Sequence, residues 1–128
     1  MNKIVEASAA YGIYTLLDMH QDVLSEKYCG EGVPAWAAES FLPRDAAQFP
    51  APIDNPYQDV ADDGFPTRQD CSKHGWAQYY NTRANADAFE SLYTNRTNLL
   101  SAWGEMWRTF AKSLGSSNIL GYEFINEP

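Results

Sequence analysis

Polar residues that could act on a substrate follow two short apolar runs of the chain. Asn126 and Glu127 follow a run near the C-terminus, and His20 and Asp22 follow another near the N-terminus. Runs of this length, rich in β-branched and aromatic residues, are typical of strands that are buried on both faces of a parallel sheet. Chemistry in such folds lies at the carboxyl ends of the strands. If the two strands are neighbours, the four polar side chains should lie within reach of one another.

A glutamate at a strand end, next to an amide and near aromatic residues, suits proton transfer to a sugar oxygen. Burial and a nearby carboxylate would raise the pKa of Glu127 so that it stays protonated near neutral pH. Asn126 could donate a hydrogen bond to a substrate hydroxyl. A retaining glycosidase needs a second carboxylate at ~5–5.5 Å. Asp22 is a candidate for that second carboxylate by its position alone.

A metal site is the competing interpretation of the first polar cluster. Asp18, His20 and Asp22 alternate along one strand, so their side chains share a face. His74 is the one other histidine of the chain, whereas zinc sites usually draw more heavily on His and Cys. We therefore predict that the site holds no metal.

The elements that must position these residues follow a simple order. We expect a helix over residues 2–11, a strand over 13–19 and a long loop over about 21–82. A helical stretch over 85–114, with a break at 94–97, and a strand over about 119–125 should follow. A strand–helix–strand unit is the repeating unit of parallel α/β folds. Because two strands cannot form a sheet with both faces covered, we expect residues 1–128 to be one incomplete α/β domain.

The long loop at about 21–82 is rich in proline, glycine and aromatic residues, and one helical turn is expected at 35–39. A loop of this length inside a compact domain tends to be functional. Its aromatic side chains suit the stacking of sugar rings or lipid-like groups, or else form a small core within the loop. They are Trp36, Phe41, Phe49, Tyr57, Phe65 and Trp76.

The two cysteines of the chain, Cys29 and Cys71, both lie in this loop. A disulfide between them would contribute about 4 kcal/mol in the chain-entropy model. Two free buried thiols are the alternative. The glycosylation sequon at residues 95–97 gives mild support to the disulfide.

The composition excludes several classes of partner. The net charge of −8 argues against binding to nucleic acid and to anionic membranes. No apolar run approaches the ~20 residues that span a bilayer, so we expect no stable membrane insertion. A hydrophobic content of 45% is that of a globular protein.

Three motifs resemble one known family. Asp18-Met-His20-Gln-Asp22, Gly30-Glu-Gly-Val-Pro-Ala-Trp36 and Gly121-Tyr-Glu-Phe-Ile-Asn126-Glu127-Pro128 are similar to motifs of the endoglycoceramidases and related glucosylceramide-cleaving enzymes of glycoside hydrolase family 5. The resemblance covers essentially the whole chain. It implies part of a (β/α)8 TIM barrel, from helix 2 to strand 4.

The resemblance also implies roles for single residues of a retaining enzyme that needs no cofactor. Glu127 would be the general acid/base, and Asn126 would bind the 2-hydroxyl of the sugar at the cleavage site. His20 and Asp22 would line the same sugar subsite. Trp76 would lie near the substrate as an aromatic contact.

The nucleophile of this family is a second glutamate on strand 7, which lies beyond these 128 residues, so Asp22 should not fill that role. The expected function is cleavage of the β-glycosidic linkage of glycosphingolipids by a longer protein that supplies the rest of the barrel. The 128 residues alone should be inactive. The alternatives are another family 5 β-glucanase or glucosidase, and a non-catalytic barrel that binds glycans or glycolipids. We expect the longer protein to be secreted or lysosomal.

Overall fold

The computed structural model describes residues 2–43, 48–57, 65–115 and 118–127. The chain divides into two compact units. The strand unit comprises Met1–Met19 and Ser101–Pro128, and the loop unit comprises His20–Leu100. Within the described residues, no helix is long and apolar enough to cross a bilayer.

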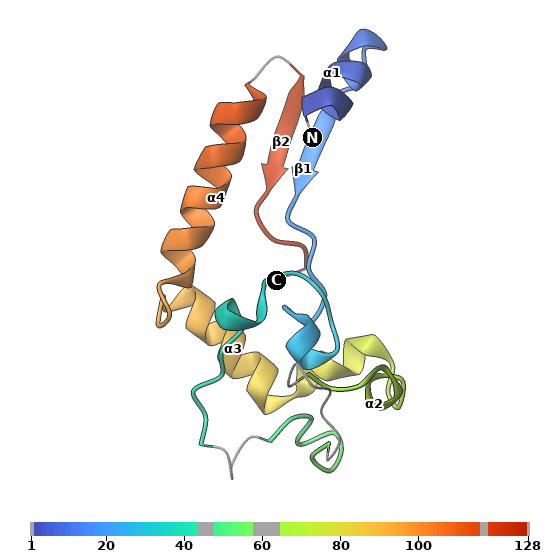
Figure 1. Cartoon of the computed structure of the whole chain (residues 1–128), viewed down its shortest axis with the longest axis vertical. Coiled ribbons are helices and arrows are strands. Elements are labelled where there is room, and N and C mark those ends of the chain that lie inside the picture. The colour runs from blue at the N-terminus through green and yellow to red at the C-terminus, as the bar shows by residue number, and fades with distance from the viewer. Residues whose placement is uncertain (1, 44–47, 58–64, 116–117, 128) are drawn as a thin grey trace. The chain divides into compact units, whose positions relative to one another are not determined.

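The strand unit is built from two helices and a parallel pair of strands. Its elements are α1 (Asn2–Ala10), β1 (Thr15–Asp18), β2 (Ile119–Glu123) and α4 (Leu99–Leu114), whose first two residues belong to the loop unit. Figure 1 shows β1 and β2 side by side with α4 alongside β2. The predicted strand–helix–strand order is therefore confirmed, and so is the break before α4.

The register of the strands brings their carboxyl ends level. Leu17 pairs with Tyr122 and Asp18 pairs with Glu123, after an irregularity at the start of β1. Trp107 of α4 is buried and lies with its ring 5.7 Å from that of Tyr122. A parallel pair with a helix packed against it is the arrangement in which both strand exits face the same way.

The prediction that both strands are buried on two faces is wrong for the described residues. Leu16 and Leu120 are 52% and 70% exposed. In helix α1, Ile4 is likewise exposed, and Val5 is the one buried residue. In the described part of the chain these two strands form the whole sheet.

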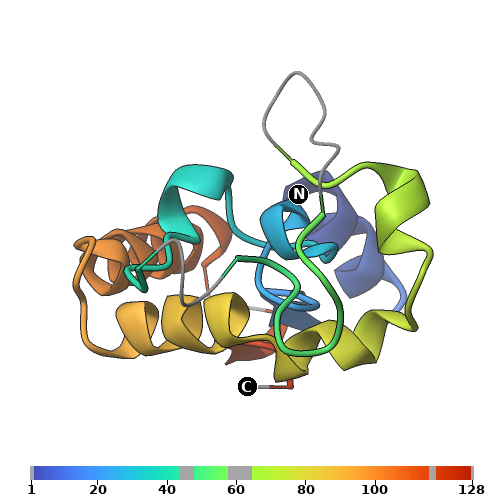
Figure 2. The same cartoon turned by 90° about the horizontal axis from the view of Figure 1, so that it is seen from below.

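The loop unit contains more regular structure than the sequence predicted. One helical turn was expected, and it is present as η2 (Ala35–Ala37). The other elements are η1 (Glu26–Tyr28), α2 (Arg68–Cys71), η3 (Trp76–Asn81) and α3 (Arg83–Tyr93). Figure 2 shows α3, in yellow, running along one side of this unit with the short helical turns beside it.

The aromatic residues of the loop divide between the two expected roles. Phe49 lies with its ring centroid 5.7 Å from that of Tyr28, 5.8 Å from Tyr57 and 5.5 Å from Tyr79. These four rings form a core within the loop. Three of the other aromatic residues named for this loop are more than half exposed, namely Trp36, Phe41 and Trp76.

The turn that follows β1 has an unusual backbone. Val23 and Leu24 are fully buried, yet both have positive φ angles, 55° and 67°. A left-handed conformation costs about 1–2 kcal/mol for such residues. The Leu24 N–H donates to Gln21 Oε1 at 2.8 Å, and the Asn85 side chain donates to the Val23 carbonyl at 2.9 Å. These buried hydrogen bonds hold the strained turn in place.

The same turn folds back on itself at residues 22 and 31. Asp22 and Glu31 form an isolated antiparallel bridge and exchange both backbone hydrogen bonds, at 3.0 and 2.7 Å. A side chain at Gly30 would place its Cβ 1.8 Å from the Asp22 carbonyl oxygen. Glycine is therefore required at this position by the close approach of the two backbone segments.

Cys29 and Cys71 form a disulfide, which confirms the predicted bond. It ties the turn after β1 to α2, over a sequence separation of 42 residues. In the described residues there are no free cysteines.

Asp87 connects α3 to two other segments of the loop unit. Its carboxylate accepts hydrogen bonds from the Phe41 N–H at 2.6 Å, from the Ser40 hydroxyl at 3.1 Å and from Arg96 at 3.0 Å. Burial opposes ionisation of Asp87, but the hydrogen bonds from Phe41, Arg96 and Ser40 outweigh it and lower the pKa of the carboxyl group. The ionised form is thus the one that the fold favours.

Replacing both cysteines, Cys29→Ser with Cys71→Ser, should lower the free energy of unfolding by about 4 kcal/mol, because the unfolded chain regains the freedom that the 42-residue loop closure removes. Urea unfolding followed by circular dichroism measures this change. A reducing agent should destabilise the wild type by the same amount and leave the double variant unaffected. A loss below ~1 kcal/mol would contradict the structural role of the bond.

Asp87→Asn should lower the free energy of unfolding at pH 7 by about 1–3 kcal/mol, because charged hydrogen bonds are lost. The folded-state pKa of Asp87 is lowered, so its stabilising effect is present above the unfolded pKa of about 3.9 and is lost as the pH falls through the folded value. The difference between wild type and variant should therefore shrink below about pH 4. Urea unfolding between pH 7 and acid pH measures it, and a pH-independent difference would contradict the account.

Gly30→Ala should destabilise the loop unit by about 2–3 kcal/mol, because the added Cβ forces the Asp22 and Glu31 segments apart. Gly75→Ala is the matched control, since a Cβ there meets nothing within 4 Å. Unfolding free energies and the amide NMR signals of residues 22 and 31 report the change. Equal effects of the two substitutions would show that the close approach is not required.

Candidate active site

The backbone hydrogen bonds of the strand pair continue past β1 and β2. The Met19 N–H donates to the Glu123 carbonyl at 3.0 Å, and the Asn126 N–H donates to the Met19 carbonyl at 3.3 Å. The expectation that the two strands are neighbours is confirmed. The chain therefore leaves β1 beside the point at which Asn126 and Glu127 follow β2.

Glu127 stands at the predicted place, at the carboxyl end of β2, but its surroundings differ from the prediction. Its side chain is exposed, whereas burial was expected. Its backbone has a φ of 42°, a left-handed conformation that is rare for a residue with a side chain and is often found at functional sites.

His20 and Asp22 lie together in the loop unit. The His20 Nε2 is 3.5 Å from Asp22 Oδ2, with side chains that are 56% and 26% exposed. Residues two apart on an extended segment point to the same side. The structure thus brings these two predicted residues into one polar cluster, as it brings Asn126 and Glu127 together in the strand unit.

Glu31 is a member of this cluster that the sequence analysis did not single out. One ligand atom from each of His20, Asp22 and Glu31 lies within 4.8 Å of the others. Asp18, which the metal interpretation had placed with His20 and Asp22, is not a member of this group. Glu31 joins the cluster because the isolated bridge pairs residues 22 and 31. Strand alternation does not predict this contact across the turn.

Trp76 begins η3 and is 52% exposed. Its ring lies edge-on to Tyr80, with ring centroids 6.1 Å apart, and Tyr80 in turn stacks with Phe89. An aromatic ring that packs against a second ring and is about half exposed to solvent is suited to stacking on a sugar. The role of Trp76 at the substrate stays a prediction.

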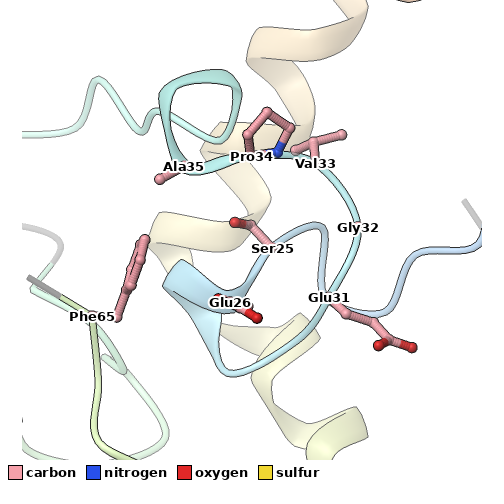
Figure 3. Close-up of a pocket in the computed structure, with 8 residues that line it drawn as sticks. All are labelled: Ser25, Glu26, Glu31, Gly32, Val33, Pro34, Ala35 and Phe65. Atoms are coloured by element: carbon pink, nitrogen blue, oxygen red, sulfur yellow. The ribbon is translucent and has the colours of Figure 1, made fainter. Parts of the chain in front are cut away.

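A cavity of about 270 Å³ lies on the inner side of the turn after β1. Figure 3 shows its lining residues, with the Phe65 ring on one side, Glu26 near the centre and Glu31 at the rim. A second cavity of about 480 Å³ lies over the disulfide and shares Glu26 and Phe65 with the first. Both belong to the loop unit.

Known proteins share the sequence and the fold of this chain. An endoglycoceramidase of Cyanea nozakii is 45% identical over 129 residues, which cover 100% of this chain and 25% of that relative. An endoglycoceramidase of Hydra vulgaris is 43% identical over 100% of this chain and 24% of the relative. No family model matches the chain.

A solved structure gives the same result. Endo-glycoceramidase II from Rhodococcus sp., in complex with a cellobiose-like imidazole, matches with a TM-score of 0.67 and 25% identity over 98% of this chain and 25% of that one. The chain therefore spans about a quarter of the length of the relatives it matches. Its two parallel strands with their helices form part of a TIM barrel. Along its whole length the chain is therefore similar in sequence and in fold to endoglycoceramidases, in agreement with the resemblance to glycoside hydrolase family 5.

Proposed function

We propose that these 128 residues are part of a retaining glycoside hydrolase that cleaves the β-glycosidic linkage of glycosphingolipids, with Glu127 as its general acid/base. The observation that carries the proposal is the placement of Glu127 four residues beyond Glu123, the last residue of a parallel strand, in a chain that is 45% identical to an endoglycoceramidase along its whole length. A carboxyl group at such a strand end can protonate the leaving oxygen and then activate water.

The partner carboxylate of a retaining mechanism has to come from outside these residues. Asp22 is already engaged with His20 at 3.5 Å, and the family resemblance assigns the nucleophile to a later strand. The residues of this chain therefore donate and accept one proton and hold the sugar, and they do not form the covalent intermediate. For this reason we propose that the 128 residues alone are inactive.

The remaining residues have binding roles in this proposal. The Asn126 amide donates to the sugar hydroxyl next to the cleaved bond. His20 and Asp22 bind further hydroxyls of the same sugar, and Trp76 stacks on a sugar ring. A hydrogen bond is worth about 0.5–1.5 kcal/mol, or about 1.5–3 kcal/mol where one group is charged, as at Asp22. Together with stacking on Trp76, these contacts fix the orientation of the substrate.

The disulfide between Cys29 and Cys71 supports an oxidising compartment, since such bonds persist in secreted and lumenal proteins and are rare in the cytosol. We propose that the longer protein is secreted or lysosomal, where glycosphingolipids are exposed to soluble hydrolases. The remainder of the barrel would cover the exposed strand residues Leu16 and Leu120.

The test is a graft of this chain into its relative from Cyanea nozakii, replacing the 129 residues that match. The grafted protein should cleave a glycosphingolipid in preference to a soluble β-glucan. Glu127→Gln should reduce kcat/KM for the glycolipid by about 10²–10⁴-fold, because the leaving oxygen loses its proton donor. Turnover is measured by chromatography of the released oligosaccharide.

Glu105→Gln is the matched control, since Glu105 lies on α4, more than half exposed and paired with Arg108. It should leave kcat/KM unchanged. A glycoside with a good leaving group should lose far less activity than the glycolipid in the Glu127→Gln graft, and azide should restore turnover as a β-glycosyl azide. A folded graft that is inactive, or full activity of Glu127→Gln, would contradict the proposal. The inactive graft would favour the alternative of a non-catalytic barrel that binds glycans.

A further inference from the structure

Glu31 is positioned by the backbone beside a residue of the proposed sugar site. Asp22 and Glu31 exchange both of their backbone hydrogen bonds. Residues paired in this way across an antiparallel bridge have their Cα atoms about 5.5 Å apart and direct their side chains to the same face. The backbone position of Glu31 is therefore set by the fold and does not depend on a contact made by the side chain itself.

The backbone on both sides of Glu31 is tightly held. A Cβ at Gly30 or Gly32 would meet Asp22 O at 1.8 Å or Gln21 Cβ at 2.6 Å. Cys29, two residues before Glu31, is tied to α2 by the disulfide. The backbone that carries the Glu31 side chain is therefore already ordered before a ligand binds.

The Glu31 carboxylate has no structural role among the described residues. Other glutamates of the loop unit form ion pairs, such as Glu39 with Lys27 at 2.9 Å and Glu90 with Arg96 at 3.0 Å. Within the described part of the chain, Glu31 takes part in no such ion pair, and its side chain is exposed. Figure 3 shows its carboxylate at the rim of the 270 Å³ cavity, pointing away from the Phe65 ring.

The Glu31, Asp22 and His20 side chains together offer a particular set of groups. Their ligand atoms lie within 4.8 Å of one another. Two carboxylates at this distance repel each other, and hydroxyl donors that bind to both relieve the repulsion. A sugar ring carries such donors on adjacent carbons, and each O–H···O bond spans about 2.5–3.0 Å. One ring can therefore contact both carboxylates at once.

We propose that Glu31 is a further substrate-binding residue, which accepts a hydrogen bond from a hydroxyl of the sugar that Asp22 and His20 also bind. This inference rests on the proposed glycosidase function and deepens it. Residues on both sides of the turn after β1, Asp22 before it and Glu31 after it, would then bind the sugar.

The first experiment measures binding to the 128-residue chain itself. Lactose is titrated into the ¹⁵N-labelled protein, up to about 50 mM because isolated subsites bind weakly. The amide signals of residues 20–33 should shift in the wild type and in Glu6→Gln, a control glutamate exposed on α1. In Glu31→Gln they should shift about 10-fold less at a lactose concentration far below saturation. Absence of shifts in the wild type, or equal shifts in Glu31→Gln, would overturn the proposal.

A divalent cation is the other ligand that this cluster could take, so Ca²⁺ and Zn²⁺ are titrated separately. If either ion moves these signals at micromolar concentration and lactose does not, the cluster is a cation site and the proposal fails. If lactose moves them in the absence of added metal, the sugar assignment stands.

The second experiment uses the graft into the Cyanea nozakii relative. Glu31→Gln should raise KM for the glycolipid about 10-fold, as expected for one lost charged hydrogen bond, with kcat changed less than about 3-fold. Glu6→Gln should change neither. An inactive wild-type graft would refute the proposed function and leave the lactose titration as the test of Glu31. An active graft whose KM is the same with Glu31→Gln would refute the inference alone.

Discussion

The turn that follows β1 constrains much of the loop unit. Val23 and Leu24 are fully buried in left-handed conformations that neither residue favours. They stay there because Gln21 and Asn85, both fully buried, hydrogen-bond to the backbone of these two residues. Since Asn85 lies on α3, its hydrogen bond joins the turn to this helix. Without that buried contact, the bridge between Asp22 and Glu31 would have no fixed support.

The strain of this turn lies next to the residues that we assign to sugar binding. A backbone forced into sparsely populated conformations is often found where a protein must present side chains in one arrangement. Here the direction of the chain reverses between Asp22 and Glu31, and the disulfide of Cys29 secures the return segment. The loop is therefore a rigid support for its polar groups, although its sequence lacks regular periodicity.

The strand unit positions the proposed acid/base by a different means. Parallel pairing brings the exits of β1 and β2 level, and the hydrogen bond from Asn126 to Met19 extends the pairing beyond the last regular residue. Glu127 then turns away from the strand direction with a φ of 42°. The carboxyl group is exposed in the described residues, so the low-polarity surroundings that a general acid needs must come from other parts of a barrel.

The strands, the two long helices and the disulfide were predictable from the sequence, because each depends on local periodicity or on a single pair of cysteines. The bridge that places Glu31 was not predictable, since it joins two segments across an irregular turn whose shape depends on Asn85, far along the chain. The exposure of Leu16 and Leu120 was also missed. Their apolar character indicates burial, but burial depends on neighbours that the described residues do not include.

The most direct test of the account is to determine the reading frame downstream of Pro128 in the transcript. The central claim is that Glu127 works with a second carboxylate that lies outside these 128 residues. The account predicts that the frame continues for ~250 residues or more, as a whole barrel requires, with a glutamate at the end of a later strand. A stop codon directly after Pro128 would contradict it, because the chain could not then carry out a two-carboxylate mechanism.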